Sequence, residues 1–372
     1  MKFTIEKNIL LENLNNTIKA ISNKNVIPIL NGIKFELTDK GLELTGSDSE
    51  LTIKTFIDRK EITNVEKEGI VIIQSKYILD IIRKMPSDLI NFELVDNVRI
   101  KIYTDNNQYN LNCLDAKEYP IVKLEENKYP ITINGDVLKS IINQTVFAIS
   151  NQELRPLLTG LNIKITGDIL ECIATDSYRL SKKTIKLSNP VENDVNIVIP
   201  GKNVMELEKI LTDEEPVEIH IFNNKILFKY KNLIFQSNLL SGTYPNTSNL
   251  IPTEFEIKST VNLNEYFDAV DRASLLTQGK DKNIVIMKIE NNNMVINSYA
   301  SEIGKVEEKL TVNSTENASI NISFSSKYML DALKVFKSDN VNILLNNDVK
   351  PIILKSDDDD SLIELILPIK TY

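Results

Sequence analysis

The sequence predicts an α+β fold that is built three times over, each copy placing two helices on an antiparallel sheet. The prediction depends first on a pattern of a short alternating strand, a small residue, a lysine and an amphipathic helix. This pattern occurs three times, and its lysines Lys76, Lys202 and Lys327 are separated by 126 and 125 residues. A period of this length is a whole domain, which indicates triplication rather than a solenoid. The many short strands in each copy indicate an antiparallel sheet.

Each copy also opens with a strand and a helix, and the strand–lysine–helix pattern follows later in the copy. The opening helix of the first copy has Leu10, Leu14 and Ile18 on one face, so it should pack on the sheet of its own domain. The opening segments cover residues 3–21, 131–149 and 255–276, and the strand–lysine–helix segments cover residues 68–85, 195–211 and 319–336.

The predicted domains are residues 1–126, 127–252 and 253–372. The first two copies end alike, with Tyr119-Pro120 and Tyr244-Pro245, which are 125 residues apart. The joins that follow are too short for flexible linkers, so we expect adjacent domains to be locked together. Three locked domains form an arc, and an arc with complementary ends closes by two-fold symmetry into a head-to-tail dimeric ring.

Such a ring could hold a nucleic-acid duplex. Twelve helices lining it would leave a bore of roughly 25 Å. The six predicted helices carry a formal charge of +3 and the rest of the chain −12, within a total of −9. A basic lining inside an acidic exterior would attract phosphates to the bore, although charged helix faces are commonly just solvated faces.

Composition excludes several other classes of protein. Hydrophobic residues make up 42% and charged residues 26%, as in an ordinary globular chain. No apolar run reaches the length of a membrane helix, and the N-terminus lacks the apolar region of a signal peptide, so we expect a cytoplasmic protein with no membrane partner. Two cysteines, Cys113 and Cys172, provide neither a disulfide framework nor a thiolate metal site.

Candidate catalytic and metal-binding residues are sparse. His220 is the only histidine and is flanked by Ile219 and Ile221, which favours a structural place in a strand over a catalytic role. The glycines form no phosphate-binding loop. The acidic run Asp357–Asp360 lacks the spacing of a calcium loop and is typical of a solvated turn, although a cation there stays possible. We therefore expect no catalytic residue, no metal and no cofactor.

Motifs along the whole chain carry a resemblance to a known family. They are Met1-Lys2-Phe3-Thr4-Ile5-Glu6, Pro28-Ile29-Leu30, Thr45-Gly46-Ser47-Asp48, Arg155-Pro156-Leu157-Leu158-Thr159-Gly160, Ala174-Thr175-Asp176-Ser177-Tyr178-Arg179-Leu180, Tyr244-Pro245 and Leu367-Pro368-Ile369-Lys370-Thr371-Tyr372. The chain thus resembles the bacterial DNA polymerase III beta subunit family, the sliding clamps, and its ending is similar to Firmicute members. The resemblance implies a homodimeric ring without catalytic activity. It would encircle double-stranded DNA and tether the replicative polymerase, which turns dissociation into sliding.

The resemblance also implies partners and contact residues. The partners are duplex DNA of any sequence, a second copy of the chain, the replicative polymerase alpha subunit, a clamp loader, and repair and translesion polymerases. It places DNA-contacting loop residues at Lys24 and Gln152. The basic starts and faces of the predicted helices add Lys76, Arg83 and Lys202 as phosphate contacts.

A partner-peptide cleft is implied between the second and third domains and the C-terminus. Its residues would be Leu158, Thr175, Ser177, Tyr178, Arg179, Leu180, Pro245, Asn249, Leu250, Pro351, Leu365, Ile366, Leu367, Pro368, Ile369 and Lys370. An apolar groove with a few polar groups is how short extended motifs are captured. A terminal strand that merely completes a sheet would account for Leu365 and Leu367, but it explains Pro368-Ile369-Lys370-Thr371-Tyr372 less well, because proline ends strand pairing. The family often has Gly-His in place of Ser177-Tyr178 and arginine in place of Asn249, so the preferred partner motif should differ.

The implied dimer seam pairs apolar residues of the first domain with the third, here Tyr109 and Leu111 against Leu275 and Leu276. Arg99 facing Glu307 or Glu308 is the one charge pair expected across it. We therefore expect apolar burial and edge-strand pairing to matter more than salt bridges.

Two other classes stay open on the sequence. One is a monomeric peptide-binding scaffold of the same fold that does not encircle DNA, which native mass would distinguish from a ring. The other is an enzyme that uses scattered carboxylates, although no pair of them stands out in a motif.

Overall fold

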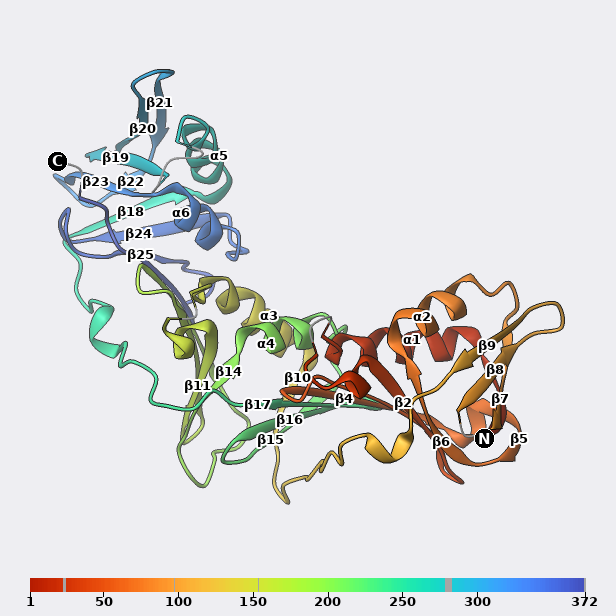
Figure 1. Ribbon diagram of the computed structural model, residues 1–372. Coiled ribbons are helices and arrows are strands. Elements are labelled where there is room, and N and C mark those ends of the chain that lie inside the picture. Colours follow the sequence, from red (N-terminus) through yellow and green to blue (C-terminus); the bar gives the residue numbers. More distant parts are fainter. Residues whose placement is uncertain (23–24, 97, 153, 278–282, 371–372) are drawn as a thin grey trace. The chain divides into compact units, whose positions relative to one another are not determined.

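A computed structural model describes residues 1–372 except 23–24, 97, 153, 278–282 and 371–372 (Figure 1). The described chain forms two compact units. The first contains residues 1–138 and 206–239, and the second contains residues 139–205 and 240–372. The predicted domain boundaries near residues 126 and 252 remain predictions.

Six α-helices occur in the described residues, two in each predicted repeat, as the sequence pattern indicated. They are α1 (Lys7–Thr17), α2 (Ser75–Lys84), α3 (Gly135–Thr145), α4 (Gly201–Glu208), α5 (Leu263–Ser274) and α6 (Ser326–Leu333). Each of α2, α4 and α6 follows directly on a strand, and the lysines Lys76, Lys202 and Lys327 stand at the second helical residue. Among the described residues, no helix combines the length and the apolar character that crossing a membrane requires.

The first unit contains two antiparallel sheets. The five-stranded sheet has the order β5-β1-β7-β8-β9 and the eight-stranded sheet the order β10-β15-β16-β17-β4-β3-β2-β6. Their strands are β1 (Lys2–Glu6), β2 (Gly32–Leu37), β3 (Gly41–Ser47), β4 (Leu51–Asp58), β5 (Ile62–Lys67), β6 (Gly69–Gln74), β7 (Leu89–Asp96), β8 (Arg99–Tyr103), β9 (Gln108–Asn112), β10 (Ile131–Asn134), β15 (Pro216–Ile221), β16 (Lys225–Tyr230) and β17 (Leu233–Asn238).

The second unit also contains two antiparallel sheets. The nine-stranded sheet has the order β14-β11-β12-β13-β26-β25-β24-β18-β22 and the four-stranded sheet the order β21-β20-β19-β23. Their strands are β11 (Gly160–Thr166), β12 (Ile169–Thr175), β13 (Arg179–Lys186), β14 (Val195–Pro200), β18 (Ile257–Asn262), β19 (Ile284–Glu290), β20 (Asn293–Ala300), β21 (Gly304–Thr311), β22 (Asn313–Ser314), β23 (Ser319–Ser325), β24 (Asn340–Leu345), β25 (Ile352–Lys355) and β26 (Leu362–Ile366).

Shared sheets join strands of successive repeats. In the first unit β17 pairs with β4, with Phe235 opposite Ile53. In the second unit β13 pairs with β26, with Leu180 opposite Leu365. Continuous backbone hydrogen bonding therefore takes the place of flexible linkers at both joins.

The pairs α1/α2 and α5/α6 bury their apolar faces against sheets. In the first unit α1 packs against β4 and against α2 (Figure 1). Leu10, Leu14, Ile78 and Ile82 are fully buried there. In the second unit α5 packs against α6, and its first turn is capped by the Asn262 side chain, which accepts a hydrogen bond from the backbone N–H of Glu265. Amphipathic helices pack on antiparallel sheets in these pairs, as the sequence predicted.

Candidate partner-binding site

An apolar cavity of about 490 Å³ opens in the second unit. Three segments form it: the 3₁₀ turn at Pro156–Thr159, the end of β12 with the residues that follow, and the connecting chain after β17. Its lining residues are Arg155, Pro156, Leu157, Leu158, Thr175, Ser177, Thr243, Pro245, Thr247 and Leu250. Leu250 is 50% exposed and Leu158 only 4%, so the cavity has an open rim over a buried floor. A concave apolar wall with hydroxyl groups suits a short peptide segment.

The turn between β12 and β13 is held by its own aspartate. Asp176 Oδ1 accepts hydrogen bonds from the backbone N–H groups of Tyr178 (2.9 Å) and Arg179 (3.0 Å). Ser177 takes a positive φ of 79°, the region that favours glycine, and its hydroxyl accepts from Arg155 Nη1 at 2.9 Å. The turn therefore presents Ser177 and the 61% exposed Tyr178 in a fixed conformation.

Arg179 lies beneath this turn and holds other elements together. Its guanidinium pairs with Asp176 (3.1 Å) and with Asp331 of α6 (2.7 Å). It donates to the carbonyl of Phe147 at 2.8 Å and stacks 4.6 Å from the ring centre of Tyr328. With 9% exposure it links β13 to α6 and does not line the cavity.

The structure brings part of the predicted cleft together. Leu158, Thr175, Ser177, Pro245 and Leu250 line the cavity. Leu180 and Leu365 lie in the buried apolar cluster that includes Leu158. The other predicted cleft residues are not among those that line the cavity: Tyr178, Arg179, Asn249, Pro351, Ile366, Leu367, Pro368, Ile369 and Lys370.

The C-terminal segment continues beyond its strand. β26 ends at Ile366, and the backbone N–H of Leu367 then donates to the Tyr178 carbonyl at 2.9 Å. The N–H of Ile369 donates to the Ser323 carbonyl at 2.7 Å. Leu367 is 38% exposed, so an apolar side chain stands at the surface beside the Tyr178 turn.

Five lining residues were not predicted: Arg155, Pro156, Leu157, Thr243 and Thr247. All lie within three residues of predicted ones, in the runs around Leu158 and Pro245. The sequence signal was present as the apolar run 156–158, but only the folded chain shows that its side chains face the same space as the connector.

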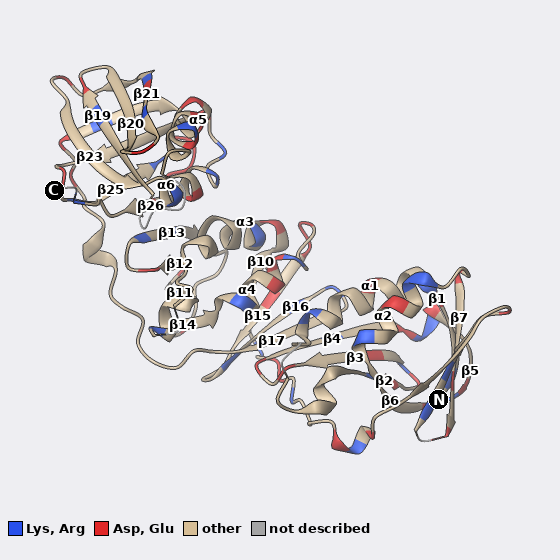
Figure 2. Cartoon of the chain, turned by 45° about the horizontal axis from the view of Figure 1, so that its top comes forward, with Lys and Arg blue, Asp and Glu red and all other residues tan. Residues whose placement is uncertain are grey.

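The predicted DNA-contacting residues lie on exposed positions where they are described. Lys76 and Arg83 are exposed on α2, Lys202 is exposed at the start of α4, and Gln152 is exposed in a loop. Basic and acidic residues both occur along α1 and α2 (Figure 2). Lys24 lies outside the described residues. Exposed ammonium groups at helix starts can meet phosphates, and their role remains a prediction.

The predicted seam residues lie at edges of their sheets or beside them. Tyr109 (39% exposed) and the partly buried Leu111 lie on β9, an edge strand, and Leu275 is 61% exposed directly after α5. Leu276 is half-buried. The charged candidates have partners within the chain, namely Arg99 with Asp96 (2.7 Å), Glu308 with Arg272 (2.8 Å) and Glu307 with Lys305 (2.9 Å).

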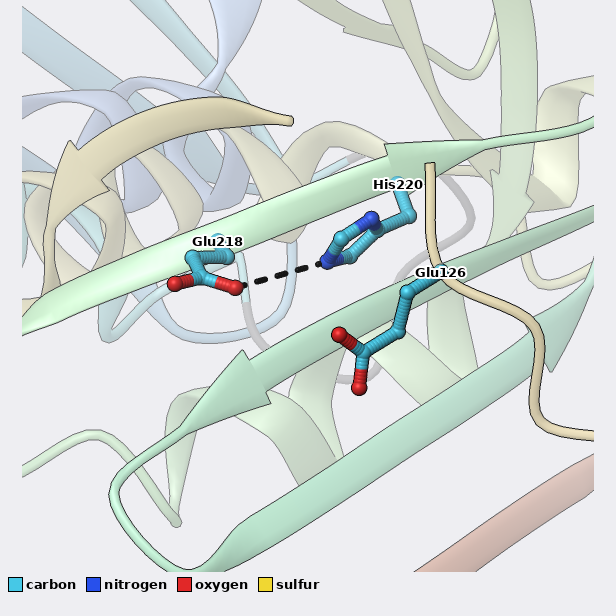
Figure 3. Close-up of side chains that lie close together, drawn as sticks. All are labelled: Glu126, Glu218 and His220. Carbon is cyan, nitrogen blue, oxygen red and sulfur yellow. Dashed lines mark ion pairs between the residues drawn. The ribbon is translucent and has the colours of Figure 1, made fainter. Parts of the chain in front are cut away.

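His220 lies in β15 with Glu218 and Glu126 close by, so that three ligating groups gather in the first unit (Figure 3). The ring is 1% exposed, and its Nδ1 accepts a hydrogen bond from the backbone N–H of Asn127 at 2.8 Å. A neutral ring then carries its proton on Nε2, which lies 3.6 Å from Glu218 Oε2. Binding a cation through Nε2 would require removing that proton, so the arrangement favours a structural role.

The acidic turn is engaged by neighbouring side chains. Asp357 accepts from Asn342 (2.8 Å) and pairs with Lys258 (3.4 Å). Asp359 pairs with Lys183 at 2.5 Å and accepts from the Ser361 hydroxyl. Two carboxylates of this run therefore bond to side chains of the same chain.

The fold and this cavity define a triplicated α+β protein whose repeats share sheets and leave an apolar groove beside a connector. Comparison with known proteins finds the same three-domain organisation along the whole length of the chain. Models of the DNA polymerase III beta subunit match its N-terminal domain at residues 1–123, its central domain at 132–246 and its C-terminal domain at 248–370. The chain belongs to the DNA polymerase III beta subunit family.

Relatives and solved structures are similar over the full chain. The beta sliding clamp of Bacillus subtilis is 41% identical, and that of Staphylococcus epidermidis is 40% identical, with 100% of each chain covered. The crystal structure of the DNA polymerase sliding clamp from Bacillus subtilis has a TM-score of 0.97 with 100% of both chains covered. That of DNA polymerase III, beta chain, from Streptococcus pneumoniae is 33% identical, with a TM-score of 0.95 and the same coverage.

Proposed function

We propose that the chain is a replicative sliding clamp, which encircles duplex DNA as a homodimeric ring and tethers polymerases to it. The full-length likeness to beta sliding clamps, at 41% identity and a TM-score of 0.97, is the observation that carries the proposal. Residues 1–126, 127–252 and 253–372 would supply three ring domains per chain. The protein would act in the cytoplasm at sites of replication.

The proposed mechanism is topological and needs no catalytic group. A closed ring cannot leave an unbroken duplex, so a polymerase bound to it stays at high effective concentration near the primer end. Contacts to DNA can then be weak and independent of sequence. Lys24, Lys76, Arg83, Gln152 and Lys202 are proposed to make them, within a chain whose net charge of −9 repels DNA elsewhere.

The apolar cavity is proposed to receive peptide segments of the partners. These are the replicative polymerase alpha subunit, the clamp loader, and repair and translesion polymerases. Leu250 at the rim and Leu157 at the wall would cover apolar side chains of the peptide. The Ser177 hydroxyl accepts from Arg155 and keeps its own proton to donate, whereas the Thr175 hydroxyl already donates to the Arg179 carbonyl. One shared cavity would make these partners compete for each clamp.

The ring is proposed to close through sheet edges. β9 and β21 are the outermost strands of their sheets in the described chain, so each has a free side for pairing with another copy. Tyr109 and Leu111 would meet Leu275 and Leu276 beside that pairing. Arg99, Glu307 and Glu308 already have partners within the chain, so apolar burial should contribute more than salt bridges.

Native mass tests ring closure. Light scattering after size exclusion should give 84.6 kDa, twice the 42.3 kDa of one chain, down to nanomolar concentration. A mass of 42.3 kDa at micromolar concentration would contradict the ring and favour the monomeric scaffold that the sequence left open.

A further inference from the structure

A second cavity adjoins the apolar one in the same compact unit, and we call it the polar cavity because polar and charged groups make up a larger part of its mixed lining. Its volume is about 790 Å³, and it lies between the nine-stranded sheet and the chain that connects β17 to β18. Thr243, Pro245 and Thr247 line both cavities. A peptide that fills the apolar cavity therefore ends or passes beside the polar one.

The sheet side of this cavity carries regularly spaced charges. Alternate residues of a strand share one face, and cross-strand neighbours stand side by side. Lys164 of β11 is opposite Glu171 of β12, and Lys182 of β13 is opposite Ile363 of β26. Lys355 on β25 completes the charged lining.

The lining has an excess of positive charge. Three lysines and one glutamate face the cavity, which leaves two positive charges uncompensated. Glu171 pairs with both Lys182 and Lys164 (3.6 Å). The Lys355 ammonium has no ion-pair partner within the described part of the chain, and its residue is half-buried.

This local sign is opposite to that of the whole chain, which has a net charge of −9. The Lys182 side chain is 23% exposed, so salt screens the field of the cavity less than that of a surface lysine. Uncompensated ammonium groups in a partly closed space select anions. Carboxylates are the anionic groups that a peptide supplies.

We propose that the polar cavity binds acidic side chains of the partner peptide whose apolar residues occupy the neighbouring cavity. The inference rests on the proposed function, and it adds a charge preference to it: acidic residues flanking the apolar segment should strengthen binding through Lys182 and Lys355. The shared lining at Thr243, Pro245 and Thr247 favours one peptide spanning both cavities over a separate nucleic-acid ligand.

The test uses the full chain and fluorescent synthetic peptides that carry the apolar clamp-binding segment of a replicative polymerase. Three glutamates or three glutamines are added at the N-terminal or the C-terminal end, which gives four probes. At 50 mM salt, the glutamate peptide of one orientation should bind at least about fivefold tighter than its glutamine twin, and 500 mM salt should reduce the difference without abolishing it.

Two variants and one control locate the effect. We call the ratio of the dissociation constants of the glutamine and glutamate peptides the glutamate advantage. Lys355→Gln and Lys182→Gln should each reduce the logarithm of this ratio by about half or more. Lys186→Gln should leave it unchanged, because Lys186 is on β13 but outside the lining, with a side chain that is 75% exposed. Circular dichroism melting would verify that all three variants fold.

The outcomes separate the inference from the proposed function. Tight binding of all four peptides without any glutamate advantage would overturn the inference and leave the apolar cleft standing. An advantage that persists in Lys355→Gln and Lys182→Gln would overturn it too. Loss of DNA binding in those variants, with peptide binding unchanged, would assign the cavity to phosphates instead. Failure of every peptide to bind would contradict the proposed cleft itself.

Discussion

Two connectors lie at the same Tyr-Pro pair in successive repeats, the first just after it and the second including it, yet they are held very differently. We call residues 121–130 the first connector and residues 243–255 the second connector. The first contains four charged residues, Lys123, Glu125, Glu126 and Lys128, whereas the second contains one, Glu254. The two connectors therefore occupy equivalent positions in their repeats but differ in the chemistry of their side chains.

The first connector is fixed on β15 and β16 within the first unit. Asn127 donates from its backbone N–H to His220 Nδ1 and from its side chain to the Ile221 carbonyl at 3.0 Å. Glu126 pairs with Lys229 at 3.0 Å. These contacts hold the connector directly against the two strands.

The second connector contributes to cavity walls in the second unit. Asn346 holds its end by donating to the Glu254 carbonyl (3.1 Å) and accepting from the Glu256 N–H (3.0 Å). Upstream of that anchor, Pro245 and Leu250 face the apolar cavity and leave room for a ligand. A duplicated domain can thus keep its fold while only one copy of a join becomes a binding site.

Among these predictions, removing the side chain that anchors the first connector should change the free energy of unfolding most. His220→Ala leaves a buried space and an unpaired Asn127 N–H, so the free energy of unfolding should fall by about 2–4 kcal/mol in urea denaturation. Glu218→Gln changes a side chain that is 42% exposed and should cost less than about 0.5 kcal/mol. If His220→Ala costs less than about 1 kcal/mol, the first connector is not anchored as described.

Truncating the second connector should affect binding rather than folding. Leu250→Ala removes exposed apolar surface from the cavity rim and should weaken a polymerase-derived peptide by at least about tenfold, with little change in stability. Ile121→Ala is the matched control, because Ile121 is 91% exposed on the first connector. If the two variants bind the polymerase-derived peptide with equal affinity in a fluorescence titration, the two connectors do not differ in function as described.

A buried carboxyl on β26, in the sheet that the second connector crosses, should make stability depend on pH. Glu364 is 2% exposed on β26, and burial raises the pKa of its carboxyl well above the ordinary value. Its Oε1 lies 2.7 Å from Ser181 Oγ. The folded state therefore binds a proton that the unfolded state releases above about pH 4.5, so stability should fall as pH rises, by at most about 1.4 kcal/mol per pH unit.

Glu364→Gln keeps the shape and the hydrogen bond without the ionisation. The variant should lose this part of the pH dependence and be at least as stable as the wild type at neutral pH. Glu215→Gln, on an exposed side chain, is the control. A wild-type free energy of unfolding that rises across the acid-to-neutral range, with the same slope in Glu364→Gln, would mean that the carboxyl is ionised in the fold.

The smallest effect is expected from the ion pairs of the first connector. Lys229→Ala breaks the pair with Glu126, but the Lys229 side chain is 39% exposed, so the cost should be about 0.2–1 kcal/mol. Repeating the urea titration in 1 M NaCl should shrink that difference. A cost that does not depend on salt would show that packing of the lysine stem, not charge, holds the segment.

The comparison also shows what a sequence can predict. The triplication, the two helices per repeat and the placement of His220 in a strand followed from periodic patterns, and all are present in the structure. Leu158 and Pro245 of the cleft came from motif resemblance. Their neighbours Leu157 and Thr247 were missed, because nothing in the local pattern tells which side of a short turn faces the groove.

Other features depend on pairs that are distant along the chain. Asn127 meets His220 across 93 residues, and Ser181 meets Glu364 across 183. The polar cavity needs Lys164 and Lys355 on strands from different repeats, placed by the β13–β26 pairing. Strand register between repeats decides these contacts, and hydrophobic alternation fixes only which face a residue occupies.

Release from DNA on linearisation tests the central claim most directly. The protein, loaded by a clamp loader with ATP onto nicked circular DNA, should co-elute with the DNA in gel filtration at high salt. Cutting the circle once should release it, because a ring that is held topologically slides off a free end. Equal retention on circular and linear DNA, or no retention on either with an active loader, would contradict the account.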